Sequence, residues 1–504
     1  MLQLLHITTE KLLITSYLIT STLLILSCSD QKKETKSNVA SNELSNQKIF
    51  KKISSEHSQI TFSNELKENI ETYDNVFNFD YFYNGAGVGV EDINNDGLLD
   101  IFFSGNQVEN KLYLNKGNLV FEDISAKAGI NINKKWSNGV TFVDINNDGW
   151  QDIYISQGGP NNRSNRNNLL YINNQDNTFT ESGKEYGLDD AGISTQTAFF
   201  DYDKDGDLDC IVMNENELYG LDPISLLKAV KTSSETKYFN SSHFYKNIDG
   251  KYFDVTKEVG LENPIFGLGL CVSDINDDGY LDIYISSDYY LPDALYLNTQ
   301  NGSFKNSVKE LTQHISFYGM GLDIADINND KLQDIFVLDM ASSDHFRAKT
   351  LMASMSTDKF NYLTSTAGFQ YQYMFNSLQL NLGQNHYSNI SQLTSMASSD
   401  WSWSVLMSDY DNDGLKDIFI TNGYRKYALD NDFQNKVYKT KVKYKGNIPN
   451  TIKQQLYDEM PSESLSNLMY KNEGHLNFKE KANDWGLEEL TFSNGAAQGD
   501  FDND

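Results

Sequence analysis

Apolar and polar residues alternate in short runs that recur along the whole chain. Examples are DIFFSG from Asp100, DIYISQ from Asp152 and DIYISS from Asp282. Alternation of β-branched and aromatic residues with a period of two is typical of β-strands. Further along each unit, segments such as KLYLNKGNLVFEDIS from Lys111 place two such runs on either side of an Asn/Gly turn, which indicates a hairpin. With a small-residue segment ahead of each unit, the pattern predicts about four strands per unit and no obligatory helix.

A nine-residue pattern rich in Asp opens each of these units. It reads DINNDGLLD, DINNDGWQD, DYDKDGDLD, DINDDGYLD, DINNDKLQD and DYDNDGLKD, and begins at Asp92, Asp144, Asp201, Asp274, Asp326 and Asp409. A seventh copy opens as DFDND at Asp500. Four-stranded units that repeat are typical of β-propeller blades. The alternatives are an open solenoid or a string of small domains, but each unit is too large for a solenoid rung and too small to bury its own core.

The expected architecture is therefore an all-β fold, a propeller of four-stranded blades that spans residues 56–504. Six complete repeats and the start of a seventh predict seven blades, the last one incomplete in this chain, and we expect the natural protein to continue beyond Asp504. Residues 60–66, ITFSNEL, resemble the last strand of a unit although no Asp-rich loop precedes them. Such a strand would complete the final blade and leave no exposed edge.

The Asp-rich loops have the oxygen spacing of a calcium site. Carboxylate or amide oxygens at loop positions 1, 3, 5 and 9, a backbone carbonyl at position 7 and Gly at position 6 can wrap a hard cation. An EF-hand would need Glu at position 12, where every copy is apolar. Magnesium is a weaker alternative. Metal-free solvated turns are weaker too, since packing several carboxylates in one turn is costly without a counter-ion. The predicted ligands, for about five or six Ca²⁺ ions, are Asp92, Asn94, Asp96, Leu98, Asp100, Asp144, Asn146, Asp148, Trp150, Asp152, Asp201, Asp203, Asp205, Asp207, Asp209, Asp274, Asn276, Asp278, Tyr280, Asp282, Asp326, Asn328, Asp330, Leu332, Asp334, Asp409, Asp411, Asp413, Leu415 and Asp417.

The six loops are not equivalent in sequence. The third and sixth loops have Asp at positions 1, 3, 5 and 9, and we expect them to bind calcium most tightly. The fifth loop has Lys331 where the others have Gly. A lysine there strains the turn and adds a positive charge, so we expect the fifth site to be the weakest of the six, or empty.

Charge and cysteine content narrow the functional classes. The chain carries 70 Asp and Glu against 41 Lys and Arg, a net charge of −29, which argues against a nucleic-acid partner. The three Cys, at positions 28, 210 and 271, exclude a disulfide framework. Cys210 and Cys271 lie in apolar runs, where buried free thiols are expected.

The N-terminus has the features of a bacterial lipoprotein signal. Residues 12–26, LLITSYLITSTLLIL, are short for a membrane span but suit the core of a signal peptide, predicted at residues 1–27. Ile25-Leu26-Ser27-Cys28 resembles a lipobox, in which Cys28 is acylated; an ordinary secretory signal is the alternative. Residues 28–55 are mostly polar, as expected of a flexible tether. The prediction is a lipid-anchored protein at the outer membrane or cell surface.

The loops, their flanks and the Y-x-N signature resemble the FG-GAP/VCBS repeats of integrin α-subunit propellers and their bacterial relatives. The similarity covers roughly residues 60–504 and extends to VCBS-repeat lipoproteins of Bacteroidota that are similar to the cartilage acidic protein (ASPIC/UnbV-associated) family. This resemblance implies a seven-bladed propeller in which calcium in hairpin loops stabilises the blades and a binding face is presented. It implies no particular ligand.

The favoured function is adhesion or ligand binding, with a glycan or a surface protein as partner, rather than catalysis. Residues 215–242, 340–375 and 424–466 are longer inserts on which recognition can depend. Tyr362, Tyr371 and Tyr373 are candidate ligand contacts, whereas Trp136, Trp401 and Trp403 fit core packing better. The alternatives are a propeller-based polysaccharide-degrading enzyme, with a catalytic carboxylate among Asp344, Asp358, Asp430 and Asp432, or a scaffold subunit of an outer-membrane complex.

Overall fold

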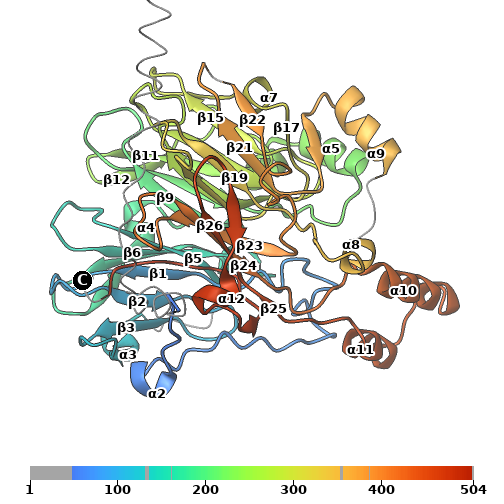
Figure 1. Cartoon of the computed structure of the whole chain (residues 1–504), viewed down its shortest axis with the longest axis horizontal. Coiled ribbons are helices and arrows are strands. Elements are labelled where there is room, and N and C mark those ends of the chain that lie inside the picture. Colours follow the sequence, from blue (N-terminus) through green and yellow to red (C-terminus); the bar gives the residue numbers. More distant parts are fainter. Residues whose placement is uncertain (1–47, 131–135, 161, 352–355, 385, 502–504) are drawn as a thin grey trace, which may run out of the picture. The chain divides into compact units, whose positions relative to one another are not determined.

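The computed structural model describes residues 48–130, 136–160, 162–351, 356–384 and 386–501 (Figure 1). Within them, six four-stranded antiparallel sheets follow one another along the chain, which confirms the predicted unit of four strands. We number the sheets 1 to 6. Their strands are β1 (Val88–Glu91), β2 (Asp100–Phe103), β3 (Lys111–Asn115) and β4 (Phe121–Asp123); β5 (Ser137–Val143), β6 (Asp152–Gln157), β7 (Leu169–Asn173) and β8 (Phe179–Glu181); β9 (Ser194–Phe200), β10 (Asp209–Asn214), β11 (His243–Ile248) and β12 (Lys251–Asp254); β13 (Gly267–Ser273), β14 (Asp282–Ser287), β15 (Ala294–Asn298) and β16 (Phe304–Asn306); β18 (Leu322–Ala325), β19 (Asp334–Val337), β21 (Ser377–Asn381) and β22 (Tyr387–Asn389); β23 (Ser402–Ser408), β24 (Asp417–Asn422), β26 (Leu468–Asn472) and β27 (Phe478–Glu480).

Neighbouring sheets share their hydrophobic cores. One core cluster combines residues of sheets 1 and 2, another combines sheets 2 and 3, and two more combine sheets 3 and 4 and sheets 4 and 5. Phe244 of sheet 3, for example, packs in the same cluster as Ile283 of sheet 4, and both side chains are fully buried. A single sheet of this size cannot bury its apolar surface alone, so stability depends on the stacking of consecutive units.

The small-residue segments that precede the Asp-rich loops form the first strand of each sheet. These first strands approach one another so closely that a Cβ atom at Gly139 would lie 2.4 Å from the carbonyl oxygen of Thr195, and one at Gly321 would lie 2.1 Å from that of Trp403. Glycine is required at these crossings because no side chain fits. The first strands of all six sheets, together with residues 494–496, line one cavity of about 360 Å³.

Residues 491–499 lie between sheet 6 and the chain that leads into sheet 1. The Ser493 N–H donates to the Asn422 carbonyl over 3.0 Å, and the Thr421 hydroxyl donates to the Asn494 carbonyl over 2.6 Å. On the other side, the Asn494 side-chain amide donates to the Tyr83 carbonyl over 3.4 Å. This segment is the small-residue flank of the seventh repeat, and β28 (Leu490–Thr491) pairs with β25 (Leu465–Ser466) just before it.

A segment that precedes sheet 1 contributes to the largest core cluster. Phe79 and Phe82 are buried there and pack against Trp136 of the second repeat. Tyr81 contacts Tyr219 and Tyr289, from the connections that follow β10 and β14. Residues 79–82 therefore connect parts of the chain that lie far apart in sequence, which the repeat pattern does not indicate.

The N-terminal residues of the described unit contact both ends of the repeat array. The Phe50 N–H donates to the Trp485 carbonyl over 2.8 Å, so the C-terminal end of the predicted tether lies against the folded unit. Residues 60–66 form no strand in the described structure, but Phe62 stacks on Phe103 of β2 at 4.9 Å between ring centroids. The predicted completion of a final blade by residues 60–66 stays a prediction.

The all-β expectation is corrected by helices in the connections between sheet strands. The longest occupy the inserts after the second strands of sheets 3, 5 and 6, where the sequence analysis placed only longer connections; Phe433 and Val437, four residues apart, form a buried helical face there. A two-stranded parallel sheet pairs β20 (Tyr371–Tyr373), in the insert of sheet 5, with β17 (His314–Ser316), which precedes β18. The helices are α2 (Ser55–Ser58), α3 (Ser125–Ala128), η2 (Arg163–Asn165), α4 (Gly183–Tyr186), α5 (Pro223–Thr232), α6 (Ser234–Phe239), α7 (Val308–Leu311), α8 (Arg347–Thr350), α9 (Thr357–Asn361), η3 (Tyr362–Thr366), α10 (Asn431–Lys443), α11 (Asn450–Asp458) and α12 (Ala482–Trp485).

Candidate metal-binding loops

Each complete Asp-rich loop joins the first and second strands of its sheet, as the predicted hairpin scaffold requires. In the second loop the two Asp144 carboxylate oxygens accept the N–H groups of Asp148 at 2.9 Å and Gly149 at 2.8 Å. Gly149 has φ +83°, and Asn147 at position 4 has φ +57°. The first Asp therefore holds the turn closed through the backbone of positions 5 and 6, and the left-handed conformation at position 6 explains the preference for Gly.

The Asp at position 9 is the buried anchor of each loop. Asp152 is fully buried; one of its oxygens accepts the Ile145 N–H at 3.1 Å and the other accepts the Asn173 N–H at 2.7 Å. The same pair of bonds is present in the other five loops, at Asp100, Asp209, Asp282, Asp334 and Asp417. This carboxylate thus joins the loop to the third strand of its sheet.

The Asn of the Y-x-N signature connects neighbouring loops. The Asn173 side-chain amide donates to the Gln151 carbonyl of its own loop at 3.1 Å and to the Ile93 carbonyl of the preceding loop at 2.8 Å. Asn298 and Asn472 make the equivalent bonds to the loops before their own. In sequence this Asn is only a repeat marker. Its fixed place in the third strand of every sheet, two residues after Tyr in β3, β7, β11, β15 and β26 and after Gln in β21, was the signal for a structural role.

Burial raises the pKa of the position-9 carboxyl groups. Loss of hydration is the main cause, the backbone N–H groups oppose it, and the neighbouring loop carboxylates add repulsion. The pKa rises to about 6 for Asp152, and it rises to about 7 for Asp100, Asp209, Asp282 and Asp334. The pKa of Asp417 is also raised, for the same main cause. A nearby cation would favour the ionised form of all six.

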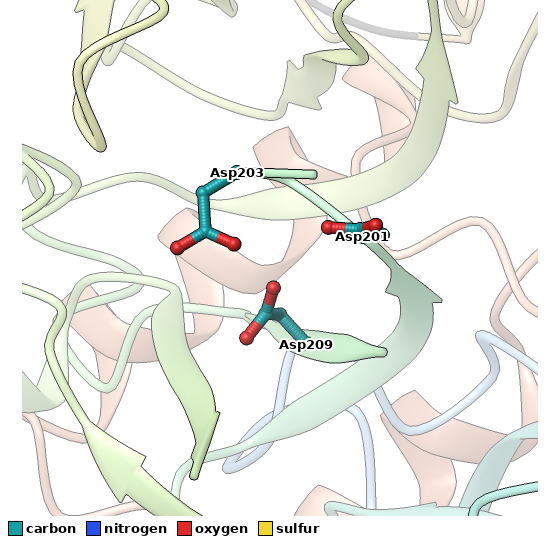
Figure 2. Close-up of side chains that lie close together, drawn as sticks. All are labelled: Asp201, Asp203 and Asp209. Carbon is teal, nitrogen blue, oxygen red and sulfur yellow. The ribbon is translucent and has the colours of Figure 1, made fainter. Parts of the chain in front are cut away.

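Two loops bring three carboxylates close enough to hold one metal ion. Asp201, Asp203 and Asp209 of the third loop each offer an oxygen within 4.8 Å of the others, and Figure 2 shows these carboxylates around a common space. Asp409, Asp411 and Asp413 of the sixth loop do the same. The Oδ1 atoms of Asp203 and Asp411 are buried and have no hydrogen-bond partner, which is the environment that a bound cation would relieve. The residues present therefore fit a hard cation.

A lysine contacts the third loop and another contacts the sixth. Lys246 of β11 forms an ion pair with the Oδ2 atom of Asp203 and lies 3.4 Å from that of Asp205. Lys471 of β26 pairs in the same way with Asp411 and lies 2.8 Å from Asp413. Both lysines are the central residue of Y-x-N. The pairing with Asp203 raises the pKa of Lys246. Each lysine therefore neutralises one charge of its loop and occupies one oxygen of the position-3 Asp.

The other four loops have Asn at position 3 and an apolar residue directly before the Asn of the third strand. Asn94 donates its side-chain amide to Asp96 at 3.0 Å, and its side-chain oxygen accepts the Asp96 N–H at 3.1 Å. Asn146, Asn276 and Asn328 repeat this arrangement. The position equivalent to Lys246 is Leu114, Ile172, Leu297 or Leu380. We call these Asn-type loops and the third and sixth Asp-type loops.

Lys331 adopts the glycine conformation of position 6 in the fifth loop. Its φ is +73°, left-handed like the +83° to +95° of the equivalent glycines, and its N–H still donates to Asp326 at 2.7 Å. The turn is thus retained at the cost of a strained backbone. The predicted weakness of this site stays a prediction.

Several other predicted residues have structural explanations. Trp136 and Trp401 are buried, and Trp403 donates its ring N–H to the Gly423 carbonyl at 2.7 Å, in line with core packing. Among the carboxylates considered for catalysis, Asp430 accepts the Phe433 N–H as the N-cap of α10, and Asp344 accepts the Arg347 N–H at α8. The ligand role of the position-7 carbonyls stays a prediction.

Further predicted features bear on ligand contacts, cysteines and the N-terminus. Tyr371 is 51% exposed and stacks on Phe360 at 6.0 Å. Cys210 is buried as expected, whereas Cys271 is only partly buried and lines the cavity between the first strands. Cys28 and the signal peptide lie outside the described residues. Across the part of the chain that the structure describes, no helix is both long and apolar enough to span a bilayer.

Comparison with known proteins confirms the repeat type. The model of the FG-GAP-like repeat matches residues 92–155, 159–212 and 240–337, so the chain contains FG-GAP-like repeats. Mouse (Mus musculus) cartilage acidic protein 1 is 26% identical over 231 residues, which is 44% of this chain but only 32% of the mouse protein. Membership of a bacterial lipoprotein family stays a prediction.

Similar solved structures include the Vibrio cholerae biofilm matrix protein Bap1, with a TM-score of 0.28 and 15% identity over 51% of this chain and 35% of that one. Another is BBS1N in complex with ARL6DN, with a TM-score of 0.32 and 6% identity over 67% of this chain and 88% of that one.

Proposed function

We propose that this protein is a calcium-loaded β-propeller that binds a glycan or a protein at the cell surface and has no catalytic role of its own. The observation that carries the proposal is the loop geometry. Six copies of one turn bring carboxylate and amide oxygens together, and in two of them Asp203 and Asp411 each have a buried oxygen without a hydrogen-bond partner. When bound, calcium would supply the positive charge that these loops lack. The residues named at positions 1, 3, 5, 7 and 9 would hold it.

The propeller part of the proposal is supported by the contacts at the two ends of the repeat array. The first strands of the six sheets line one cavity together with residues 494–496. Asn494 contacts Thr421 of sheet 6 on one side and Tyr83, ahead of sheet 1, on the other. This placement is what a seventh blade between sheets 6 and 1 requires. Calcium in the loops would then fix the backbone where consecutive blades meet.

The binding role is supported by the position of the helical inserts. The Asp-rich loops join first and second strands, whereas the inserts join second and third strands. Since neighbouring strands are antiparallel, inserts and loops lie at opposite ends of the sheets. The metal loops would thus stabilise one end while the inserts present variable surface at the other, as recognition loops on rigid scaffolds commonly do.

Calcium binding is tested by thermal unfolding of the chain without residues 1–28, in excess calcium and in chelator. A ligand that binds only the folded state adds about 2.7 kcal/mol per site at a concentration of 100 Kd. We expect a large rise in Tm with calcium, a smaller one with magnesium, and a calorimetric stoichiometry of five or six. An unchanged Tm together with no measurable calcium binding would show that the loops are metal-free turns.

The anchor is tested separately by cell fractionation. With Cys28 acylated, the protein should sediment with membranes, and Cys28→Ser should prevent that. Surface exposure would then be read from protease accessibility on intact cells. Recovery of the unsubstituted protein in the soluble fraction would contradict the lipoprotein assignment and leave the calcium proposal unaffected.

A further inference from the structure

The first part of the insert between β24 and β26 concentrates positive charge in an otherwise acidic molecule. Residues 425–453 contain eight Lys or Arg and two Asp, a net charge of +6, while the whole chain carries −29. The remaining residues therefore carry −35. Such a local reversal of sign indicates an anion-binding surface more strongly than a charged helix in a neutral protein would. The field around the rest of the molecule repels anions.

The helix that carries most of this charge is firmly attached to the folded unit. Asp430 caps the N-terminus of α10, and Phe433 and Val437, one turn apart, are buried in the largest core cluster. Phe433 stacks on Phe77 with ring centroids 6.4 Å apart, and Lys436 pairs with Glu459 beyond α11. In Figure 1, α10 and α11 lie beside each other, outside the four-stranded sheets. The exposed face of α10 is thus held in a fixed place.

A polar stripe runs along that exposed face. Its members follow the i, i+3, i+4, i+7 spacing of one helix side and line a shallow groove: Asp432, Asn435, Lys436, Lys439, Thr440 and Lys443. The three lysines are exposed, and Lys439 is in no ion pair within the described residues. From Asp432 to Lys443 the helix rises by eleven steps, which is about 16 Å at 1.5 Å per step. Tyr438, which is 67% exposed, borders the stripe by its helical position.

We propose that this stripe binds a segment of acidic polysaccharide. The lysines would pair with carboxylate or sulfate groups, while Asn435 and Thr440 offer hydrogen bonds to the hydroxyl groups of the sugars. The exposed ring of Tyr438 provides a face on which a sugar can pack. The inference rests on the proposed glycan-binding role and narrows it to a ligand class and a site.

Other anionic partners fit this surface less well. A lipid bilayer would require a broad exposed apolar face, but among the described residues the groove is lined by polar side chains alone, and the exposed large apolar side chains of α10 are only Tyr438 and Val442. A long nucleic acid would meet the field of the other −35 charges, whereas a short polysaccharide segment along one helix would not need to contact them. Association with a second copy of this chain would leave unexplained the uncharged polar groups of the stripe, which match the hydroxyl groups of sugars.

The test compares two charge-matched triple variants. Lys436→Gln/Lys439→Gln/Lys443→Gln removes the stripe, and Lys441→Gln/Lys445→Gln/Lys453→Gln removes the same charge from the same insert off the stripe. Binding of the full chain to immobilised dextran sulfate and polygalacturonate is measured against uncharged dextran, at low and high salt and with calcium held constant. We expect the stripe variant to bind both acidic polymers about tenfold more weakly, and the off-stripe variant to stay within about threefold of the unsubstituted protein.

Each outcome is informative. An equal loss in both variants would show that the polymer is held by non-specific charge attraction and not by the stripe. Binding that neither variant weakens would show that the site lies elsewhere. Absence of binding to any acidic polymer would overturn the inference, while calcium-dependent unfolding of the same sample would still test the proposed function. Capture by vesicles with anionic lipid, lost only in the stripe variant, would overturn it in favour of a membrane surface. Matching Tm values for all three proteins confirm that folding is unchanged.

Discussion

The Asn-type and Asp-type loops solve the same electrostatic problem in two ways. In the first loop, Asn94 places one neutral oxygen at position 3, and the middle residue of Y-x-N is Leu114. In the third loop, Asp203 stands at position 3, and Lys246 from β11 occupies one of its two oxygens. The remaining oxygen of Asp203 has no hydrogen-bond partner. An Asp paired with a Lys thus offers one free oxygen and adds no net charge, which makes it equivalent to an Asn.

This comparison alters the ranking that a count of loop carboxylates suggests. The third and sixth loops are expected to bind calcium most tightly because they have a fourth carboxylate. Lys246 and Lys471, however, lie 35 or more residues after their loops in the sequence, and only the pairing of the second and third strands brings them into contact. The charge next to a metal depends on the neighbouring strand as well as on the loop.

The largest expected effect concerns what the two loop types share, the buried Asp at position 9. Asp209→Ala in an Asp-type loop and Asp282→Ala in an Asn-type loop should each lower the free energy of unfolding by about 2–5 kcal/mol, since two buried N–H donors lose their acceptor. Urea unfolding in excess calcium measures the loss. Glu122→Ala, at an exposed carboxylate on β4, should change little. A loss confined to one loop type would break the equivalence.

The next effect is a pH dependence in the absence of metal. Burial raises the pKa of the position-9 carboxyl to about 6 or 7 in five of the six loops, for example at Asp152 in an Asn-type loop and at Asp209 in an Asp-type loop. The folded state therefore holds these protons at a pH where the unfolded chain has released them. The stability that these groups contribute in chelator should be fully present below about pH 4 and be lost as pH rises to about 7. The added stability from calcium should grow over the same range, and denaturant unfolding at each pH with and without calcium measures both trends.

A double-mutant cycle tests the Asp–Lys equivalence itself. Lys246→Leu should raise the calcium affinity of the third loop about tenfold, because it removes a positive charge beside the site. Asp203→Asn should lower that affinity, and the double variant, which recreates an Asn-type loop, should return to within about threefold of the unsubstituted protein. Leu297→Lys introduces the lysine into the Asn-type fourth loop and should weaken it. An unchanged calcium affinity of the third loop in Lys246→Leu would show that Lys246 is a bystander.

The smallest effect concerns the fifth loop. Lys331→Gly should stabilise the protein by up to about 1 kcal/mol, because a residue with a Cβ atom is strained at a left-handed φ and glycine is not. The reverse change, Gly149→Lys in the second loop, should destabilise by a similar amount, since a Cβ there would meet no heavy atom within 4 Å and only the backbone conformation would oppose it. Chemical unfolding in chelator separates this backbone effect from calcium binding.

Much of the local structure follows from short-range pattern. Alternation over DIYISQ gives β6, the Asn/Gly turn in KLYLNKGNLVFEDIS gives the β3–β4 hairpin, and the glycine at position 6 has the predicted positive φ. These features depend on the backbone preferences of a few adjacent residues. The inserts were harder to predict, because helices such as α5 and α10 are stabilised largely by tertiary packing of one face. Leu226 of α5 and Phe433 of α10 are buried on that face.

By itself, the sequence determined the repeat, its four strands, the turn geometry and the oxygen donors of each loop, since these are set within nine to fifty residues of chain. The tertiary structure decided which residues complete each loop: Asn173 reaches the loop before its own, and Lys246 reaches Asp203. It also decided that Phe79 and Phe82 pack against Trp136 in the largest core, and that α10 presents Lys439 to solvent. Such contacts join segments whose separation along the chain is set by insert length, and burial and charge pairing act on distance in space rather than in sequence.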